Sequence, residues 1–578
     1  MLFCTATLTG QVPIVPLSEV RAGQRATGRT VFSGTTIEDF DVEILGVMQN
    51  VGPKQSIILG RLSGGPLEKT GVLQGMSGSP VYLDGRLLGA VALAFPMSTE
   101  PIAGIRPIEE MLRVRAARSA AARRRSLWET DLTKPLASAE EVLAGGSRLV
   151  EIATPVSFSG FTSGTLREFG PQLRALGLEP LQGGGGGRTK AAEDAPAVEP
   201  GSMISVLLLT GDMSVGADGT VTHVEGPKVY AFGHRFLSVG QTELPFARSE
   251  VLTLAPNLAT SFKISSSREL VGTITADYST AVQGLLGSHA DTVPVTIRVS
   301  GPAAEGPPLT YSYHMGMVND RFLSPFLLQM ALYSTIDATE RTVGASTVAL
   351  RGSVEFDNGV GTVRLDDVFA GEGNVAMAAS LGAAAPLAYL LQTGFDELRL
   401  KSVSLDIDVF AERRQWVIDQ VWPSRKAARP GETVELMIVL SGENGAEQLR
   451  KVEYKVPPGS PLGPLYFTVA DALTTNLMEY FHLIGQRMRT PSQVVNLVNE
   501  LRSSTGAYVR VWRADRSFQI EGRSLPAPPP SVALVLGRSQ PEAGGAASSY
   551  TSKVTEIRFD LGDAAVTGSK TTQVDIKE

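Results

Sequence analysis

The hexapeptide GMSGSP, from Gly75 to Pro80, surrounds Ser77 with glycines in a turn between two strand-like segments. A nucleophilic serine must project from the backbone, with amide N–H groups directed at the point where an oxyanion forms. Gly75 tolerates the backbone angles that this requires, so the N–H groups of Gly75 and Ser77 are candidates for an oxyanion hole. The same pattern is also typical of a glycine-rich β-turn without chemistry. The hexapeptide alone leaves acyl transfer at Ser77 and a structural turn both open.

A nucleophilic serine needs a general base, and histidine supplies it most often. No histidine precedes Ser77 in the chain. His234 follows it, at the end of the apolar segment KVYAF and beside Gly233, which is typical of a catalytic imidazole at a strand end. The other histidines are interpreted as structural residues of a turn, a loop, a strand and a helix, in this order: His223, His289, His314 and His482. His234 is therefore the candidate base.

The sequence predicts neither a metal site nor another cofactor. No two histidines have the spacing of metal ligands, and the one cysteine, Cys4, is remote from all of them. A single cysteine also excludes an intramolecular disulfide.

The composition indicates a foldable, β-rich protein. The 60 glycines and 35 prolines among 578 residues predict many turns and short strands, and hence a mainly β fold with some α. The net charge of −7 gives no electrostatic footprint for nucleic acid. The longest uncharged run, Gly373 to Phe395, is long enough for a bilayer, but its polar residues and Pro386 favour a buried, alanine-rich helix. We therefore expect no nucleic-acid partner and no integral membrane span.

Short strands in two separate blocks must position Ser77 and His234. A helix is expected between the blocks, from Pro107 to about Arg125, with acidic residues in its first turn and arginines at its end. The predicted organisation is a serine-bearing β-barrel block at 12–115, an Arg-rich helix and linker at 116–146, a histidine-bearing β-barrel block at 147–320 with a Gly-rich insertion at 182–201, an α+β domain at 321–415, an immunoglobulin-like β-domain at 416–470, a small α/β segment at 471–526, and a Pro/Gly/Ser-rich tail with a late strand at 527–578.

Both blocks resemble the SpoIVB serine peptidases of the chymotrypsin-like clan. The first block carries FDVEILGV, TGVLQGMSGSPVYLDGRLLGAVALAF and GIRPIEEML, and the second carries ADGTVTHVEGPKVYAFGHRF, ELVGTITADYSTAVQGLLG and VPVTIRV. In the sporulation enzyme GMSGSP ends the chain, whereas here the serine block precedes the histidine block. The resemblance implies a permuted chymotrypsin-like double β-barrel, followed by β-sandwich and α+β domains. It also implies that Ser77 is the nucleophile and His234 the general base.

The acidic member of the triad departs from the family pattern. The family keeps an aspartate shortly before the serine turn, where this chain reads GRLSGGPLEKTG, and Glu68 is too near the turn to align with it. Asp277, in TITADYS of the histidine block, is the best candidate, and Glu243 and Asp41 are weaker ones. A Ser–His dyad is a further alternative, because the carboxylate mainly orients the imidazole and stabilises its charged form.

The function expected from the residues and the resemblance is a serine endopeptidase acting on a protein or peptide. Such an enzyme could be regulatory, or could process its own linker near 126–146 or 182–201. The alternative is a catalytically inactive peptidase-fold scaffold or binding protein of the cell envelope. The resemblance implies an extracytoplasmic protein of bacterial origin, either periplasmic or secreted.

Overall fold

The computed structural model describes residues 13–113, 141–144, 147–183, 197–302, 307–339, 344–483, 490–515, 517–520, 523–526, 528–537 and 547–578. Strands predominate over helices, which confirms the mainly β fold with some α. The chain divides into two compact units: unit 1 is Met1–Val295 with Tyr313–Ser334, and unit 2 is Thr296–Ser312 with Thr335–Glu578. Both Ser77 and His234 belong to unit 1.

Six strands of the serine-bearing block close into a barrel, which we call barrel 1. They pair in the order β4-β1-β2-β3-β6-β5, and the pairing of β4 with β5 completes the ring. Apolar side chains that alternate along these strands, among them Phe40, Val42 and Ile105, fill the interior. The strands are β1 (Arg25–Ser33), β2 (Thr36–Gly52), β3 (Gln55–Ser63), β4 (Pro80–Leu83), β5 (Arg86–Ala94) and β6 (Ile102–Pro107).

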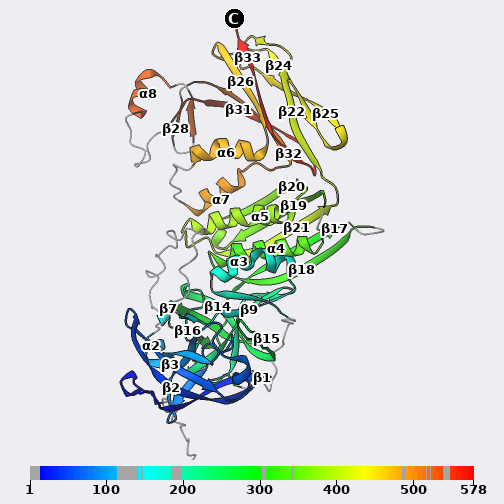
Figure 1. Cartoon of the computed structure of the whole chain (residues 1–578). Coiled ribbons are helices and arrows are strands. Elements are labelled where there is room, and N and C mark those ends of the chain that lie inside the picture. Colours follow the sequence, from blue (N-terminus) through cyan, green and yellow to red (C-terminus); the bar gives the residue numbers. More distant parts are fainter. Residues whose placement is uncertain are drawn as a thin grey trace, which may run out of the picture. The chain divides into compact units, whose positions relative to one another are not determined.

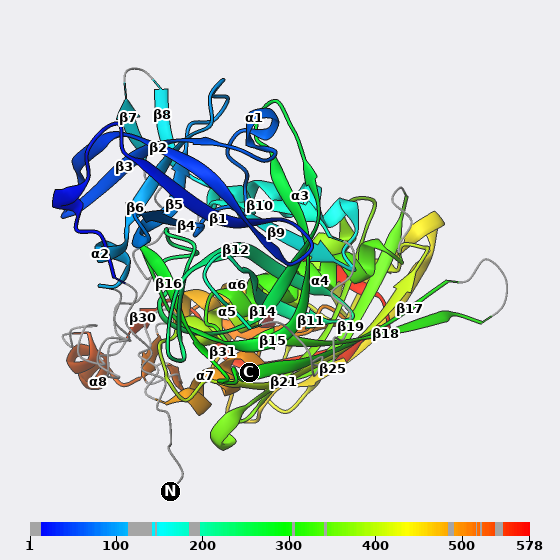
Figure 2. The same cartoon turned by 90° about the horizontal axis from the view of Figure 1, so that it is seen from below.

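Six strands of the histidine-bearing block close into barrel 2. Their order is β12-β13-β16-β15-β14-β11, and the pairing of β11 with β12 completes this ring. The double-barrel architecture expected from the sequence is therefore confirmed, and Figure 2 shows the strands of barrel 1 in blue next to β12 and β16 of barrel 2. The strands are β11 (Met203–Gly211), β12 (Ser214–Glu225), β13 (Lys228–Ala231), β14 (Gly240–Ala255), β15 (Phe262–Tyr278) and β16 (Ala281–Leu286).

Shorter elements complete unit 1. The helix expected from Pro107 is present as α2, which covers only Ile108–Met111, and its predicted continuation beyond Arg113 lies outside the described residues. Most of the predicted Gly-rich insertion lies outside them as well. The other elements are α1 (Leu67–Thr70), β7 (Glu141–Ala144), β8 (Ser147–Glu151), β9 (Thr154–Ser159), α3 (Ser163–Ala175) and β10 (Leu178–Gln182).

The division between the units passes through β17 (Thr292–Gly301), β18 (Leu309–Val318) and α4 (Leu323–Asp337). In unit 2, β21 (Leu400–Phe410), β19 (Ser346–Phe356) and β20 (Thr362–Gly371) form a sheet, along which α5 (Val375–Gln392) packs (Figure 1). Among the described residues α5 is the one helix that is long and apolar enough to span a membrane, and half of it is buried. It corresponds to the alanine-rich helix expected from the sequence.

The rest of unit 2 contains a β-sandwich. One sheet has the order β25-β24-β22-β32 and the other β23-β33-β26-β27-β31, and their apolar side chains share one core. The segment expected to be a tail supplies β31 (Ser552–Asp560), β32 (Ala565–Thr567) and β33 (Ser569–Ile576) to these sheets. The other strands are β22 (Gln415–Pro423), β23 (Ala427–Ala428), β24 (Thr433–Ser441), β25 (Glu447–Lys455), β26 (Gly463–Ala470) and β27 (Gly506–Arg513). The flanking elements are α6 (Ala472–Leu483), α7 (Pro491–Asn499), α8 (Pro530–Leu536), β28 (Ser517–Ile520), β29 (Arg523–Pro526) and β30 (Ala547–Ser549).

Candidate active site

Ser77 lies in the connection between α1 and β4, at the edge of barrel 1. Gly75 and Gly78 have φ angles of +90° and +93°, a conformation that side chains strongly disfavour, which explains the glycines of the hexapeptide. The N–H of Ser79 donates to the carbonyl of Met76 at 2.9 Å, and the N–H of Gly78 donates to the carbonyl of Val91 on β5 at 2.7 Å. The turn is therefore fixed internally and tied to the barrel wall.

The N–H groups of Gly75 and Ser77 donate no hydrogen bond to any residue that the structure describes. Their carbonyl groups, in contrast, are bonded: Thr220 donates its N–H to the carbonyl of Ser77 at 2.8 Å and its Oγ1–H to the carbonyl of Gly75 at 2.9 Å. Two available donors in a rigid turn meet one requirement of an oxyanion hole.

Barrel 2 docks onto the serine turn through β12. Thr222 donates its Oγ1–H to the carbonyl of Gly78 at 2.7 Å, next to the two bonds from Thr220. The approach at Gly78 is so close that a Cβ atom there would lie 2.0 Å from the carbonyl oxygen of Thr220 and 2.5 Å from the backbone nitrogen of Phe232. The serine turn thus contacts Phe232, which lies two residues before His234 in the chain.

His234 lies in the connection between β13 and β14 and is buried. The preceding Gly233 has a φ angle of +70°, and a Cβ atom at this position would lie 3.2 Å from the Cβ atoms of Ala90 and Ala92 on β5. The ring of His234 stacks on Phe232, with centroids 6.0 Å apart and an interplanar angle of 23°. Because Gly78 and Gly233 both contact β5 around Val91, the structure brings the two sequence-predicted segments together at one strand.

The imidazole of His234 has a defined proton arrangement. Its Nδ1 atom lies 2.6 Å from the carbonyl oxygen of Arg235, and because a carbonyl only accepts, Nδ1 carries the proton. Burial lowers the pKa of His234 to about 4, the charges of Arg106 and Arg235 act in the same direction, and the bond to the Arg235 carbonyl acts against them. The imidazole is therefore neutral at pH 7, with a lone pair on Nε2.

Two buried polar atoms of the site have no hydrogen-bond partner among the described residues: the Oγ of Ser77 and the Nε2 of His234. They do not bond to each other in the structure. Unpaired buried polar atoms are uncommon in native proteins because each forfeits its interaction with water, and such atoms are often found at catalytic positions. Their presence in two contacting segments marks this region as the candidate site.

Asp277, the sequence-predicted acid, lies at the end of β15 and is fully buried. Its carboxylate accepts N–H groups from Phe236 at 2.8 Å, Leu237 at 2.7 Å and Val239 at 3.3 Å, and none of these bonds involves His234. Burial raises the pKa of Asp277, and the backbone N–H groups act against this shift. The structure thus places Asp277 as the anchor of the loop that follows His234.

The weaker acid candidates lie elsewhere. Asp41 on β2 and Glu243 on β14 are exposed, and Glu243 accepts the N–H of Asp291 at 3.4 Å. The structure brings neither of them into hydrogen-bond contact with His234. The hydrogen-bond acceptor at Nδ1 is instead the main-chain carbonyl of Arg235.

Residues that the sequence did not single out complete the surroundings. Arg106 is fully buried and donates from Nε to the carbonyl of Gly233 at 3.4 Å and from Nη1 to Gln55 at 3.0 Å. Lys263 is fully buried beside Gly75. The sequence carries one signal for Arg106 and Lys263: each is a charged residue within a strand of otherwise apolar or small residues, in GIRPI and FKISSS respectively.

None of the other histidine side chains that the structure describes bonds to Ser77 or His234. His223 on β12 stacks on Tyr230, with centroids 6.1 Å apart, whereas His289 and His314 lie in a loop and in β18, and the side chain of His482 is outside the described residues. Within the described ranges, no group of three or more His, Cys, Asp or Glu residues could hold a metal ion.

Comparison with known proteins supports the assignment of the first block. Residues 4–112 match the family model of the SpoIVB peptidase S55, which confirms the resemblance inferred from the sequence for the serine-bearing block. This match includes Ser77 with its turn, and barrel 1. No curated protein and no solved structure matched the chain.

Proposed function

With the serine-bearing barrel assigned to the peptidase S55 family, we propose that the chain is a serine endopeptidase with Ser77 as nucleophile and His234 as general base. The single observation that carries the proposal is the meeting of the two segments at β5, each with an unpaired buried reactive atom. The mainly β double barrel supplies the rigid scaffold that such a pair requires.

The proposed reaction begins when Nε2 of His234 accepts the proton of the Ser77 hydroxyl while Oγ attacks the carbonyl carbon of a peptide bond. The oxyanion that forms is stabilised by the N–H groups of Gly75 and Ser77, and loss of one such donor typically costs about 3–4 kcal/mol of transition-state stabilisation. The imidazolium returns its proton to the leaving amine. Water then hydrolyses the acyl-enzyme by the same route, with His234 again the base.

The Arg235 carbonyl takes the orienting role that a carboxylate has in a triad. It accepts a hydrogen bond from Nδ1–H, at an N···O distance of 2.6 Å, and so keeps the lone pair of Nε2 free to act as a base. A neutral carbonyl stabilises an imidazolium less than a carboxylate does. We therefore expect slower catalysis than from a complete Ser–His–Asp triad.

Access of the substrate requires movement, because Ser77 is 0% and His234 2% exposed. The same burial favours a second candidate function, an inactive peptidase-fold scaffold that binds a partner in the cell envelope. Under this alternative the serine turn is purely a contact between the barrels.

Self-processing is a narrower form of the same activity. The linkers proposed for cleavage, 126–146 and 182–201, lie mostly outside the described residues. Cleavage there would yield discrete fragments that are absent from a Ser77→Ala variant. We also propose, from the family resemblance, that the protein acts outside the cytoplasm.

Hydrolysis of an unfolded protein substrate tests the proposal against the scaffold alternative. Purified protein would be incubated with a reduced, alkylated protein mixture, and new peptide termini would be counted by mass spectrometry. New termini that disappear in both Ser77→Ala and His234→Ala support the enzyme. Identical peptide patterns for wild type and Ser77→Ala contradict it.

A further inference from the structure

A buried lysine of barrel 2 lies directly against the serine turn of barrel 1. The backbone of Lys263 on β15 donates its N–H to the carbonyl of Gln74 at 3.1 Å, and the N–H of Gln74 donates to the carbonyl of Ser261 at 2.9 Å. A Cβ atom at Gly75 would lie 3.3 Å from Cδ of Lys263. The lysine stem therefore fills the space beside the glycine that begins the turn.

The amine of Lys263 reaches the other end of the same turn. Nζ donates to Oγ1 of Thr30 on β1 at 2.8 Å, and Oγ of Ser79 donates to the same Oγ1 atom at 3.1 Å. The side chains of Lys263, Thr30 and Ser79 are all buried. The stem of Lys263 thus lies against the turn before Ser77, and its amine is linked to Ser79, after Ser77, through the hydroxyl group of Thr30.

Burying an ammonium group is costly, and a nearby carboxylate offsets part of the cost. Burial lowers the pKa of Lys263 to about 7, and the charge of Asp218 acts against this shift. Asp218 on β12 is itself held by hydroxyl groups, with bonds from Ser157 at 3.2 Å and Ser249 at 3.0 Å.

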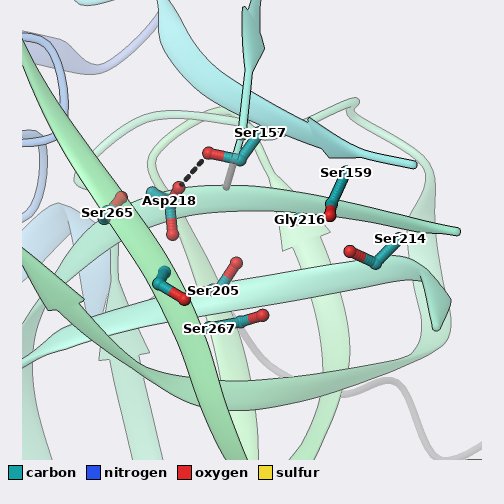
Figure 3. Close-up of a pocket in the computed structure, with 10 residues that line it drawn as sticks. Ser157, Ser159, Ser205, Ser214, Gly216, Asp218, Ser265 and Ser267 are labelled. Carbon is teal, nitrogen blue, oxygen red and sulfur yellow. Dashed lines mark hydrogen bonds between the residues drawn. The ribbon is translucent and has the colours of Figure 1, made fainter. Parts of the chain in front are cut away.

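Figure 3 shows Asp218 with Ser157 and with Ser265, which is two residues from Lys263 on β15. Serine side chains line a cavity of about 20 Å³ here, large enough for about one water molecule. The surroundings of Lys263 are thus polar as well as buried, and the stability cost of burying Lys263 calls for a role beyond packing.

We propose that Lys263 is a positioning residue for Ser77, which fixes both ends of the turn Gly75–Ser79 from barrel 2 through its stem and through the Thr30 bridge. This inference rests on the proposed function. Barrel 2 would then supply both the general base, His234, and a residue that positions the nucleophile, Ser77.

The test separates the stem from the amine. Lys263→Met keeps the stem and removes the amine, while Thr30→Val removes the bridge and keeps the lysine. The probe is a fluorophosphonate. The readouts are the maximal inactivation rate kinact, the half-saturating probe concentration KI and the melting temperature. The matched control is Lys228→Met, at an exposed lysine on β13.

We expect kinact to fall about tenfold in Lys263→Met and in Thr30→Val, with KI unchanged and with an unchanged or higher melting temperature for Lys263→Met. The double variant should be no slower than the slower single variant, because both substitutions break the same hydrogen bond between Lys263 and Thr30. Lys228→Met should behave as wild type.

Three results overturn the inference. One is an unchanged kinact in Lys263→Met while wild type is labelled at Ser77, which leaves the proposed function intact. Another is a fall in kinact that accompanies a lower melting temperature and is absent from Thr30→Val, which indicates a purely structural role. Failure of wild type to be labelled at Ser77 overturns the proposed function together with this inference.

Discussion

The Nδ1 atom of His234 lies 2.6 Å from the carbonyl oxygen of Arg235, the residue that follows it in the chain. A main-chain group therefore orients the candidate base. The carboxylate of Asp277 does not bond to His234, but accepts the N–H groups of Phe236 and Leu237 in the loop that begins after Arg235. This relationship explains how the chain could function without an aspartate at the place where the family keeps one.

Burial of His234 makes stability depend on pH in a defined window. The pKa of the imidazole is about 4 in the folded protein and 6.5 for an unperturbed histidine side chain, so the unfolded state binds more protons between these values. The free energy of unfolding should fall by about 3 kcal/mol as the pH drops from 6.5 to 4, with no further contribution below 4.

Denaturant unfolding of wild type and His234→Gln at several pH values measures this contribution. The difference in unfolding free energy between the two proteins should be constant above pH 6.5. By pH 4 wild type should have lost about 3 kcal/mol relative to His234→Gln. Parallel curves for the two proteins over this window would show that the imidazole is solvated.

Gly78→Ala should separate the serine turn from barrel 2. The added Cβ would lie 2.0 Å from the carbonyl oxygen of Thr220, and the φ angle of +93° disfavours any side chain. We expect a loss of about 3 kcal/mol or more in the free energy of unfolding, from the clash and the backbone strain together.

Gly85→Ala is the matched control for Gly78→Ala. Gly85 also has a positive φ angle, +76°, but nothing lies within 4 Å of its Cβ position. It should lose only the strain of about 1–2 kcal/mol. Equal losses in the two variants would mean that the close contact with Thr220 does not exist in solution.

Asp277→Asn should loosen the loop that follows His234. The amide places donor hydrogens where the carboxylate accepts the N–H groups of Phe236 and Leu237, so buried donors are left unpaired. We expect a loss of about 2–4 kcal/mol in unfolding free energy, and a fall of at least tenfold in the rate at which a fluorophosphonate labels Ser77.

Asp320→Ala serves as the control for this variant, because both bonds to Asp320 end on Oδ1, which an asparagine would keep. Asp320 likewise accepts two backbone N–H groups, from Phe322 and Leu323. It should lower stability and leave the labelling rate unchanged. A normal labelling rate in Asp277→Asn would show that the loop does not position His234.

Much of the site could be predicted from the sequence because glycines mark its backbone. Gly75, Gly78 and Gly233 all have positive φ angles in the structure, and they flank Ser77 and His234. The family match confirmed the resemblance of the serine block, the strand pattern predicted a β-rich fold, and the double barrel was implied by the family resemblance.

Other features depend on contacts that sequence patterns do not reveal. The bond from His234 to Arg235 uses a main-chain carbonyl, which every residue has. The bridge from Lys263 to Thr30 joins residues 233 positions apart, and β33 pairs with β26 across a distance of about one hundred residues, so only the folded chain brings these partners together. The full burial of Lys263 likewise arises only in the folded chain.

The most direct test of the central claim, that a serine of barrel 1 and a histidine of barrel 2 form one catalytic pair, is site-mapped labelling with a fluorophosphonate. Wild type, Ser77→Ala, His234→Ala and the control Ser98→Ala, at an exposed serine of the same block, would be treated in parallel, and the adduct would be located by peptide mass spectrometry. We predict one adduct on Ser77 in wild type, none in Ser77→Ala, a loss of at least about a thousandfold in rate in His234→Ala, and an unchanged rate of Ser77 labelling in Ser98→Ala. Equal labelling of wild type and His234→Ala, or an adduct that persists in Ser77→Ala, would contradict the account.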